Sequence, residues 1–360
     1  MKIEDLGYDD SFEVNRNKLG LAEFSVARVV VQHRGVYKVK NADGEYLAKI
    51  TGKRMFEAVS REDYPAVGDW VAIAVLGQGQ AIIRGVLPRR TIIKRKHGDR
   101  DRLKEKSETQ IIGTNIDVAF VVESVDRDYN LNRLERYFAI VGDGGVKPAI
   151  IINKTDLISK TELDLKLTQL RARFGDADIV ITSTRTEEGL DELKARIQSG
   201  KTYCFLGSSG VGKSSLINKL LGENVIKTEE ISLSTGKGRH TTTNREMYFL
   251  ENGGIVIDNP GMREVGMTDV SAGIDNLFDE ITALADKCKY ADCAHIEEPG
   301  CGVLLALKAG KLDKDKYLNY INLKKEAKHY EMTELEKREK DRRFGKFIKK
   351  AKEEVKRYKS

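Results

Sequence analysis

A glycine-rich loop near the middle of the chain has the residue types and spacing that bind phosphate. The stretch Gly207-Ser208-Ser209-Gly210-Val211-Gly212-Lys213-Ser214-Ser215 fits G-x-x-x-x-G-K-[ST], follows an apolar strand pattern at 203–206 and precedes a helical pattern. Its glycines let backbone N–H groups surround an anion, and the helix that follows directs its positive end at the same place. We expect Lys213 to reach the β- and γ-phosphates of a nucleotide and Ser214 to ligate Mg²⁺.

A second motif indicates that the base is guanine. Asn153-Lys154-Thr155-Asp156 stands at the end of an apolar strand pattern at 149–152 and matches N-K-x-D. The Asp156 carboxylate can accept hydrogen bonds from guanine N1–H and the 2-amino group, whereas adenine offers neither donor and would leave the carboxylate unpaired. Lys154 is expected to cover the plane of the base, and Asn153 to tie neighbouring loops together.

The loop Thr182-Ser183-Thr184-Arg185 follows another strand pattern, at 179–182. Sites of this kind support the guanine with a backbone N–H at this place, and Ser183 is the candidate. A polar loop that begins the next helix would have the same composition, so both interpretations stay open.

Two further stretches have the composition of nucleotide-dependent switches. Asp258-Asn259-Pro260-Gly261 resembles D-x-P-G, in which Asp258 would hold Mg²⁺ through water and the Gly261 N–H would meet the γ-phosphate. Gly238–Thr243 lies in a stretch rich in Gly, Ser and Thr. It is suited to a first switch in which one of its threonines, with Thr243 as the candidate, completes the magnesium shell.

Three of the four cysteines lie close together near residue 290. The pattern Cys288-x4-Cys293-x-His295-x5-Cys301 supplies three thiols and one imidazole within 14 residues. Four such ligands are what a closed, structural Zn²⁺ site requires, and a reducing compartment favours metal over disulfides. Buried free cysteines beside an unrelated histidine are the alternative. We expect Cys204, inside a strand pattern, to be a core residue.

The hydrophobic patterns divide the chain into three kinds of structure. About five short strands between residues 22 and 87 suggest a small barrel of oligonucleotide-binding type. From Ile116 onward, strands alternate with helices, which predicts a parallel sheet covered on both faces. A helix at 303–309 and a long charged helix from about Asp313 follow the cysteines. The only tryptophan, Trp70, is expected in the barrel core.

Charge and hydropathy narrow the possible partners and the location. The net charge of the chain is +6, and residues 311–360 carry 18 Lys/Arg against 10 Asp/Glu, which leaves the rest slightly acidic. A basic tail suggests a polyanionic partner such as RNA, although a solvated helix would have the same charges. Residues 88–106 contain nine basic and three acidic residues and are expected to be a solvent-exposed linker. The sequence has no membrane-length apolar run and no signal peptide, so we expect a cytoplasmic protein without membrane contact.

Taken together, these motifs resemble the bacterial RsgA family (also called YjeQ), circularly permuted GTPases that act in maturation of the small ribosomal subunit. The resemblance includes Pro65-Ala66-Val67-Gly68-Asp69, Leu87-Pro88-Arg89-Arg90 and Asn115-Ile116-Asp117. It continues through the base motif, which here precedes the phosphate loop, and ends with the cysteine spacing. Because all these loops gather at one edge of a sheet, a permuted chain still assembles one site.

The resemblance implies a multi-domain fold and its ligands. An N-terminal OB-type β-barrel (1–90) and a basic linker (91–112) would precede a central α/β P-loop GTPase domain (113–275) and a C-terminal helical zinc-binding module with a basic tail (276–360). GTP/GDP, Mg²⁺ and one Zn²⁺ per chain would be the cofactors. The partner would be the small ribosomal subunit and its rRNA, which stimulate slow hydrolysis by a monomer.

The motifs alone do not identify the residue that orients the attacking water. Ras-like enzymes orient water with a glutamine after D-x-x-G, and Met262 stands at that place here. The resemblance points to His240, whose neutral imidazole could accept from water, with Lys213 neutralising charge. A switch-loop histidine that contacts RNA or solvent is the alternative. The family usually has Thr or Ser where this chain has Asn259. Another function stays open: an RNA-binding, GTP-dependent switch protein with a different client and little intrinsic catalysis.

Overall fold

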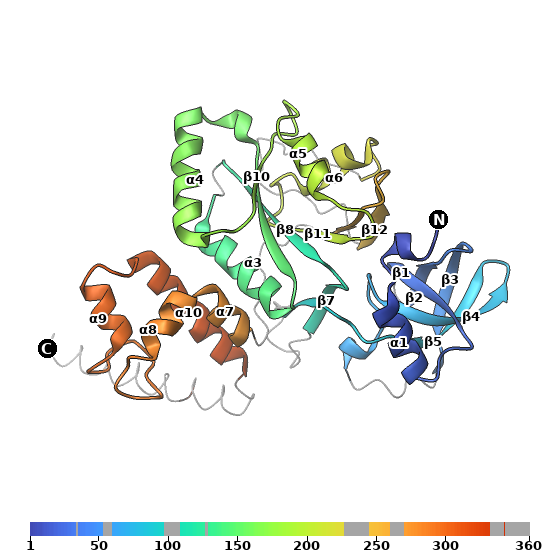
Figure 1. Ribbon diagram of the computed structural model, residues 1–360, viewed down its shortest axis with the longest axis horizontal. Helices are drawn as coiled ribbons and strands as arrows, with labels where there is room; N and C mark the ends of the chain where they lie inside the picture. Colours follow the sequence, from blue (N-terminus) through green and yellow to red (C-terminus); the bar gives the residue numbers. More distant parts are fainter. Residues whose placement is uncertain are drawn as a thin grey trace, which may run out of the picture. The chain divides into compact units, whose positions relative to one another are not determined.

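The computed structural model describes residues 1–33, 35–52, 60–96, 109–126, 129–226, 245–259, 270–331 and 342. The chain divides into two compact units, Met1–Gly266 and Met267–Ser360. Figure 1 shows them in blue to yellow and in orange to red. The four-part division expected from the sequence stays a prediction, since the two units do not separate the barrel from the central domain.

The first unit begins with a closed five-stranded barrel. Its strands have the order β1-β2-β3-β5-β4, and β4 pairs back with β1, so the barrel closes. Alternate residues point inward and form one buried cluster that includes Val29, Tyr37 and Ile83. Trp70 is fully buried, which confirms that it is a core residue. The strands are β1 (Ser25–His33), β2 (Val36–Lys40), β3 (Glu45–Ile50), β4 (Trp70–Gly77) and β5 (Gln80–Val86).

A short N-terminal cap packs on the barrel and was not foreseen from the sequence. It consists of the 3-10 helix η1 (Glu4–Leu6) and helix α1 (Asp10–Lys18), whose Leu6 and Phe12 are buried with Trp70. Asp9 caps α1 by accepting from the Ser11 N–H. The cap therefore belongs to the same core as the barrel. A further 3-10 helix, η2 (Arg61–Asp63), precedes β4.

The central domain is built on a sheet with the order β10-β9-β8-β11-β13-β12. All neighbouring pairs are parallel except β12–β13, an antiparallel hairpin. The strands alternate with helices, which confirms the predicted α/β architecture. They are β8 (Val118–Ser124), β9 (Lys147–Asn153), β10 (Ile179–Ile181), β11 (Thr202–Leu206), β12 (Glu246–Phe249) and β13 (Ile255–Asp258).

Helices cover both faces of this sheet. Helices α5 (Leu190–Arg196) and α6 (Lys213–Leu221) bury apolar side chains against one face, together with Phe120 and Phe205. Helix α3 (Leu131–Asp143) is adjacent to β8 and β9 and joins α4 (Lys160–Phe174) through an aromatic contact and the Arg173–Glu135 ion pair. The 3-10 helix η3 (Thr155–Leu157) lies between β9 and α4.

Two strands lie where the sequence suggested only a linker. β6 (Ile92–Lys96) and β7 (Thr109–Thr114) form an antiparallel pair, and β6 is adjacent to α3. The part of the basic stretch from 97 to 108 lies outside the described residues. Residues 92–96 and 109–114 are therefore ordered strands of the first unit.

The barrel and the central sheet are joined edge to edge. Val31 of β1 is the antiparallel partner of Glu246 of β12, so one sheet of 11 strands runs through both parts. A buried arginine adds a second connection: Arg28 donates to the carbonyls of Leu6, Gly68 and Asn115, three segments far apart in the sequence. The close approach here requires a glycine, since a Cβ on Gly68 would lie 2.1 Å from the Thr114 carbonyl oxygen.

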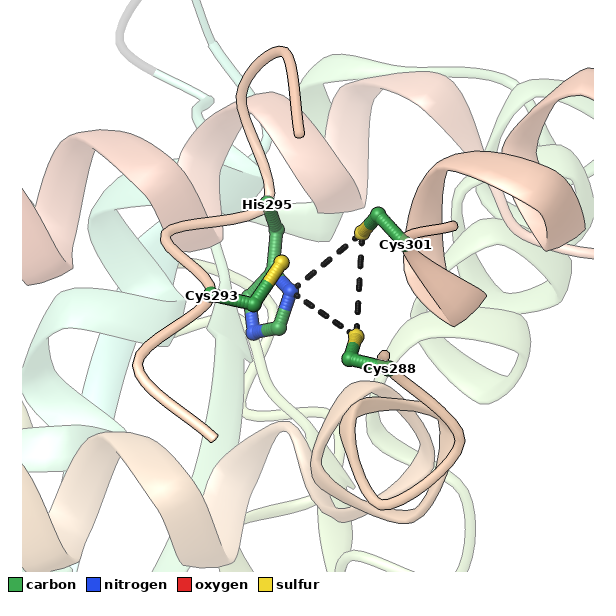
Figure 2. Close-up of side chains that lie close together, drawn as sticks. All are labelled: Cys288, Cys293, His295 and Cys301. Atoms are coloured by element: carbon green, nitrogen blue, oxygen red, sulfur yellow. Dashed lines mark hydrogen bonds between the residues drawn. The ribbon is translucent and has the colours of Figure 1, made fainter. Parts of the chain in front are cut away.

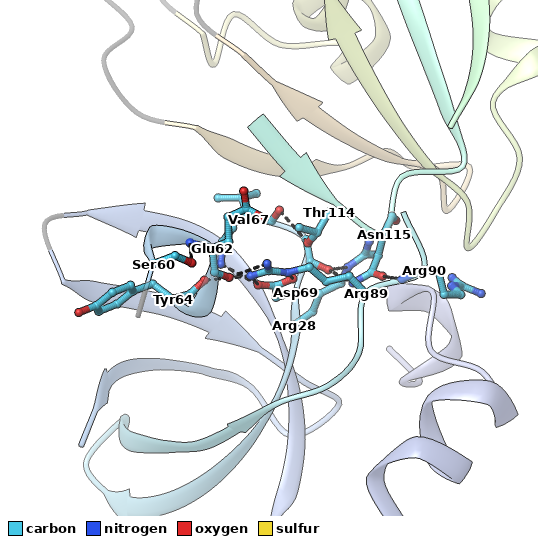
Figure 3. Close-up of polar contacts among 12 residues, drawn as sticks. Arg28, Ser60, Glu62, Tyr64, Val67, Asp69, Arg89, Arg90, Thr114 and Asn115 are labelled. Atoms are coloured by element: carbon cyan, nitrogen blue, oxygen red, sulfur yellow. Dashed lines mark hydrogen bonds and ion pairs between the residues drawn. The ribbon is translucent and has the colours of Figure 1, made fainter. Parts of the chain in front are cut away.

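A bidentate ion pair holds the segment that follows β5 of the barrel (Figure 3). Nε and Nη2 of Arg89 contact the two carboxylate oxygens of Asp69 at 2.8 and 2.7 Å. The same guanidinium donates to the backbone carbonyls of Glu62 and Tyr64. Asp69 is fully buried, and Arg89 together with the Ala66 N–H supplies hydrogen bonds to its carboxylate.

The second unit is helical. Phe278 and Tyr320 stack edge to face at 5.4 Å within its core, and Ile281 and Val303 are buried. Among the residues described here, no helix has the length and apolar character needed to cross a membrane. The helices are α7 (Ser271–Leu277), α8 (Asp279–Ala285), α9 (Gly302–Lys308) and α10 (Lys314–Glu331).

Replacing Arg89 should strongly destabilise the first unit. Arg89→Ala leaves the buried Asp69 carboxylate without its cation, and removing one partner of a buried pair costs about 3–5 kcal/mol. The matched control is Arg196→Ala, because Arg196 pairs with Asp178 in solvent, where both side chains are more than 30% exposed. We expect that control to change the free energy of unfolding by less than about 1 kcal/mol. Urea unfolding of both variants measures the difference; equal losses would contradict the assignment.

Candidate nucleotide site and metal centre

The phosphate loop connects β11 to α6 and is shaped by its glycines. Gly207 and Gly212 have φ of 143° and 100°, a region that favours glycine. A Cβ would lie 2.3 Å from the Val122 carbonyl oxygen at Gly207 and 2.2 Å from the Asn153 amide at Gly212. The loop therefore lies tightly against the ends of β8 and β9, where a side chain would not fit.

The lysine of this loop is folded into it. Lys213 is buried, and its ammonium donates to the carbonyl oxygens of Gly207 at 2.9 Å and Ser208 at 2.7 Å. Burial lowers the pKa of Lys213 to about 8, although the negative charge of Asp258 acts in the opposite direction. A buried cation held by two carbonyl dipoles is suited to an anionic ligand in the loop.

Asp258 ends β13, beside Phe205 of the phosphate-loop strand. It is buried, and neither carboxylate oxygen accepts a hydrogen bond of normal geometry from the described residues. Burial raises the pKa of Asp258 to about 6, although Lys213 acts in the opposite direction. An unpaired buried carboxylate fits a divalent cation or its water, since Mg²⁺ prefers oxygen ligands.

The next residue departs from the family pattern and has a structural contact of its own. The Asn259 amide nitrogen donates to the sulfur of Cys204 at 2.9 Å, across to the phosphate-loop strand. Cys204 is buried in β11, which confirms that it is a core residue, and burial raises the pKa of its thiol to about 12. Asn259 thus ties the segment after Asp258 to β11.

Asn153 joins three loops of the candidate site. Its side-chain N–H donates to the Val211 carbonyl of the phosphate loop at 2.8 Å, and its carbonyl accepts from the Thr182 hydroxyl at 3.1 Å. Thr155 adds a bond from its hydroxyl to the Thr182 carbonyl. The base motif, the phosphate loop and the loop after β10 are therefore held in one arrangement.

Asp156 is held by Ser183. The Ser183 hydroxyl donates to one Asp156 oxygen at 2.6 Å, and Arg185 lies 4.0 Å from the other oxygen. The Ser183 backbone N–H donates to the Glu188 carbonyl, so the contact of Ser183 with the base motif is made by its hydroxyl. This orients the carboxylate that would read the base.

The predicted site residues fall into two groups. Those in the phosphate loop, together with Asn153–Asp156, Ser183 and Asp258, lie at the carboxyl ends of β9, β10, β11 and β13, at one edge of the sheet. His240, Thr243, Gly261 and Met262 lie outside the described residues. Sequence reasoning missed Asp126, which forms an ion pair with Lys154 at 2.8 Å. Its position just after β8 was the available signal.

The three cysteines and the histidine of the predicted zinc site, here called the cysteine module, lie close together in the second unit (Figure 2). The ligand atoms of Cys288, Cys293, His295 and Cys301 all lie within 4.8 Å of one another. His295 Nδ1 is 3.5 Å from the sulfurs of Cys288 and Cys301, and those sulfurs are 3.8 Å apart. Tetrahedral Zn²⁺ with bonds of about 2.3 Å to S and 2.0–2.1 Å to N separates such ligands by about 3.5 and 3.8 Å. The side chains present fit zinc.

The protein around this cluster supports thiolates. Backbone N–H groups of Gly302 and Leu304, in the first turn of α9, donate to the sulfurs of Cys288 and Cys301. Burial lowers the pKa of His295, which favours its neutral, metal-binding form. The Tyr317 hydroxyl donates to the His295 carbonyl and connects the cluster to α10. This bond holds the backbone that carries His295.

Comparison with known proteins gives one family along the whole chain. The model of the RsgA GTPase family matches residues 86–268. A Bacteroides thetaiotaomicron protein, small ribosomal subunit biogenesis GTPase RsgA 1, is 38% identical over 98% of this chain and 96% of its own. A Lactiplantibacillus plantarum protein, small ribosomal subunit biogenesis GTPase RsgA 2, is 39% identical over 89% of each chain.

Solved structures show the same fold. The crystal structure of YjeQ from Thermotoga maritima has a TM-score of 0.60 and 27% identity, over 83% of this chain and 96% of that one. The structure of YloQ, described as a circularly permuted GTPase, has a TM-score of 0.59 and 21% identity, over 86% and 97%. The circularly permuted GTPase fold that the order of the motifs predicted is thus confirmed.

Purified protein should contain one zinc ion per chain, held by the cluster in the second unit. Cys301→Ser and His295→Ala each remove one of four ligands and should lower zinc content at least tenfold after dialysis against a weak chelator, measured by atomic absorption. The matched control is Cys204→Ala, which removes the buried cysteine of β11 and should keep the zinc. Wild-type protein that retains no zinc, or a Cys204 variant that loses it, would contradict the assignment.

Proposed function

Because this chain belongs to the RsgA GTPase family, we propose that it assists late maturation of the small ribosomal subunit and hydrolyses GTP under stimulation by that subunit. The chain is a GTP-hydrolysing enzyme, and its relatives are named small ribosomal subunit biogenesis GTPases. The observation that carries the proposal is the gathering of the phosphate loop, the base motif and Asp258 at one sheet edge.

The phosphates are bound by the loop at 207–215. Backbone N–H groups of this loop and of the first turn of α6 surround the β-phosphate. The Lys213 ammonium exchanges its two carbonyl partners for phosphate oxygens, which costs little because both states keep it hydrogen-bonded. Its positive charge then neutralises the charge that develops as water attacks the γ-phosphorus.

Three side chains are assigned to the magnesium ion: Ser214, Thr243 and Asp258. Mg²⁺ held by these side chains would neutralise negative charge on the phosphates. Asp258 suits this role because its carboxylate is buried and unpaired, so the cation removes a cost that the nucleotide-free protein carries. The Gly261 N–H is assigned to the γ-phosphate.

Guanine is recognised by the base motif. Asp156, held by the Ser183 hydroxyl, accepts from guanine N1–H and the 2-amino group. ATP offers Asp156 neither of these two donors, which should cost its binding a few kcal/mol. Thr155 and Asn153 hold the loop that presents Asp156, through their bonds to Thr182 and Val211.

The remaining parts bind the partner. The closed barrel has the topology of oligonucleotide-binding folds, and the basic tail suits rRNA. The zinc module holds one Zn²⁺ through Cys288, Cys293, His295 and Cys301 as a structural ion. We propose that the protein acts as a monomer in the cytoplasm, where its ribosomal partner is.

The experiment that tests this function is GTP turnover by the purified protein, with and without small ribosomal subunits, and with ATP as the control. We expect a slow intrinsic rate, a many-fold increase with subunits, and no turnover of ATP. A rate indifferent to the subunit would contradict the proposed partner. No turnover in either condition would favour an RNA-binding switch protein with another client.

His240 is proposed to position the attacking water, because Met262 can neither donate nor accept usefully at the place of the usual glutamine. His240→Ala should lower subunit-stimulated turnover by about 100-fold and leave the dissociation constant for GTP nearly unchanged. Lys213→Ala provides the contrast, since it should weaken both turnover and binding. An unchanged stimulated rate in His240→Ala would remove His240 from the mechanism.

A further inference from the structure

Lys154 of the base motif has an anionic partner that lies outside all the motifs. Its ammonium is 2.8 Å from one carboxylate oxygen of Asp126, two residues beyond the end of β8. The other oxygen of Asp126 accepts from the Ser124 hydroxyl, also at 2.8 Å. Both carboxylate oxygens are therefore engaged, which fixes the direction from which Lys154 is held.

The backbone of Lys154 is fixed as well. Its φ of 62° and ψ of 34° place it in the left-handed region, which is costly for a residue with a Cβ. Its neighbours enforce this conformation, since Asn153 is bonded to the phosphate loop and Thr155 to the Thr182 carbonyl. Lys154 is thus held at its backbone by β9 and at its ammonium by the segment after β8.

We propose that Asp126 is a positioning residue of the guanine site. Its ion pair with Lys154 holds the aliphatic part of the lysine side chain in the position where it contacts the plane of the purine. The inference rests on the proposed function, because it needs guanine nucleotide at the base motif. A free lysine side chain loses rotamer entropy when it is ordered, and this loss opposes binding. The ion pair orders the stem before the nucleotide arrives, so binding does not carry that cost.

Whether loss of Asp126 weakens or strengthens nucleotide binding distinguishes the positioning role from two other roles, electrostatic repulsion of the nucleotide and blocking of the base site. Removing a negative charge near a polyanionic nucleotide would by itself strengthen binding. If the ion pair had to break before the base could bind, removing Asp126 would also strengthen binding. A positioning role predicts the opposite, weaker binding without Asp126. Because the contact is with the base plane, GDP and GTP should be affected by the same factor.

Asp126→Asn is the test, with GDP and GTP dissociation constants measured on the full chain with Mg²⁺. Exposed ion pairs contribute up to about 1 kcal/mol, so we expect about three- to fivefold weaker binding of both nucleotides, through faster dissociation and with kcat unchanged. The matched control is Asp178→Asn, which removes the Asp178–Arg196 ion pair at the opposite edge of the sheet and should leave both constants unchanged. Unchanged or tighter binding in Asp126→Asn would overturn the proposal.

Two further variants exclude a merely structural effect. Lys154→Met keeps the aliphatic stem and removes the ammonium, so adding Asp126→Asn to it should cause no further loss. Asp126→Glu, which keeps the charge, should recover at least half of the lost affinity. Additive losses in the double variant, or no recovery with Glu, would overturn the proposal. Wild-type protein that binds no guanine nucleotide would overturn the proposed function itself, and the two failures are therefore distinguishable.

Discussion

The nucleotide site depends on the pairing of β11 with β8 on one side and β13 on the other. β11 leads into the phosphate loop, so its two neighbours decide which chain segments meet the phosphates. β13 delivers Asp258, and β8 with β9 delivers Asp126 and the base motif. Since parallel strands end at the same edge, the order of these segments along the chain is free to change. A chain with this permuted order of motifs can therefore bring the same loops together in one site.

The same sheet extends into the barrel. Glu246 of β12 has Asp258 of β13 as its partner on one side and Val31 of β1 on the other, so β13, which carries the proposed magnesium ligand Asp258, and the barrel strand β1 are two strands apart. Arg28 and the Arg89–Asp69 pair reinforce the junction with charge-assisted bonds that join segments up to 87 residues apart. A partner that binds the barrel thus contacts a body continuous with the catalytic sheet.

Both candidate sites bring together titratable groups that are at least partly buried. Lys213 and Asp258 are buried with shifted pKa values of about 8 and about 6, because burial disfavours both charged forms. The cysteine module brings three thiols and an imidazole within 4.8 Å, an arrangement whose deprotonated form a bound cation would stabilise, in addition to the backbone N–H groups of α9. Binding of phosphate, Mg²⁺ or Zn²⁺ would compensate the cost of these polar groups.

The sequence by itself determined the local elements: the five barrel strands, the alternating strands and helices, the phosphate loop and the cysteine spacing. These depend on residues close together in the chain, whose periodicity and glycine positions set the backbone. It missed β6 and β7 because their charged residues resemble a linker, and it also missed α1, α7 and α8. Tertiary structure alone decided the contact between β1 and β12, the place of Arg28 and the pairing of Asp126 with Lys154. Such contacts depend on which strand ends become neighbours, and no local pattern encodes that.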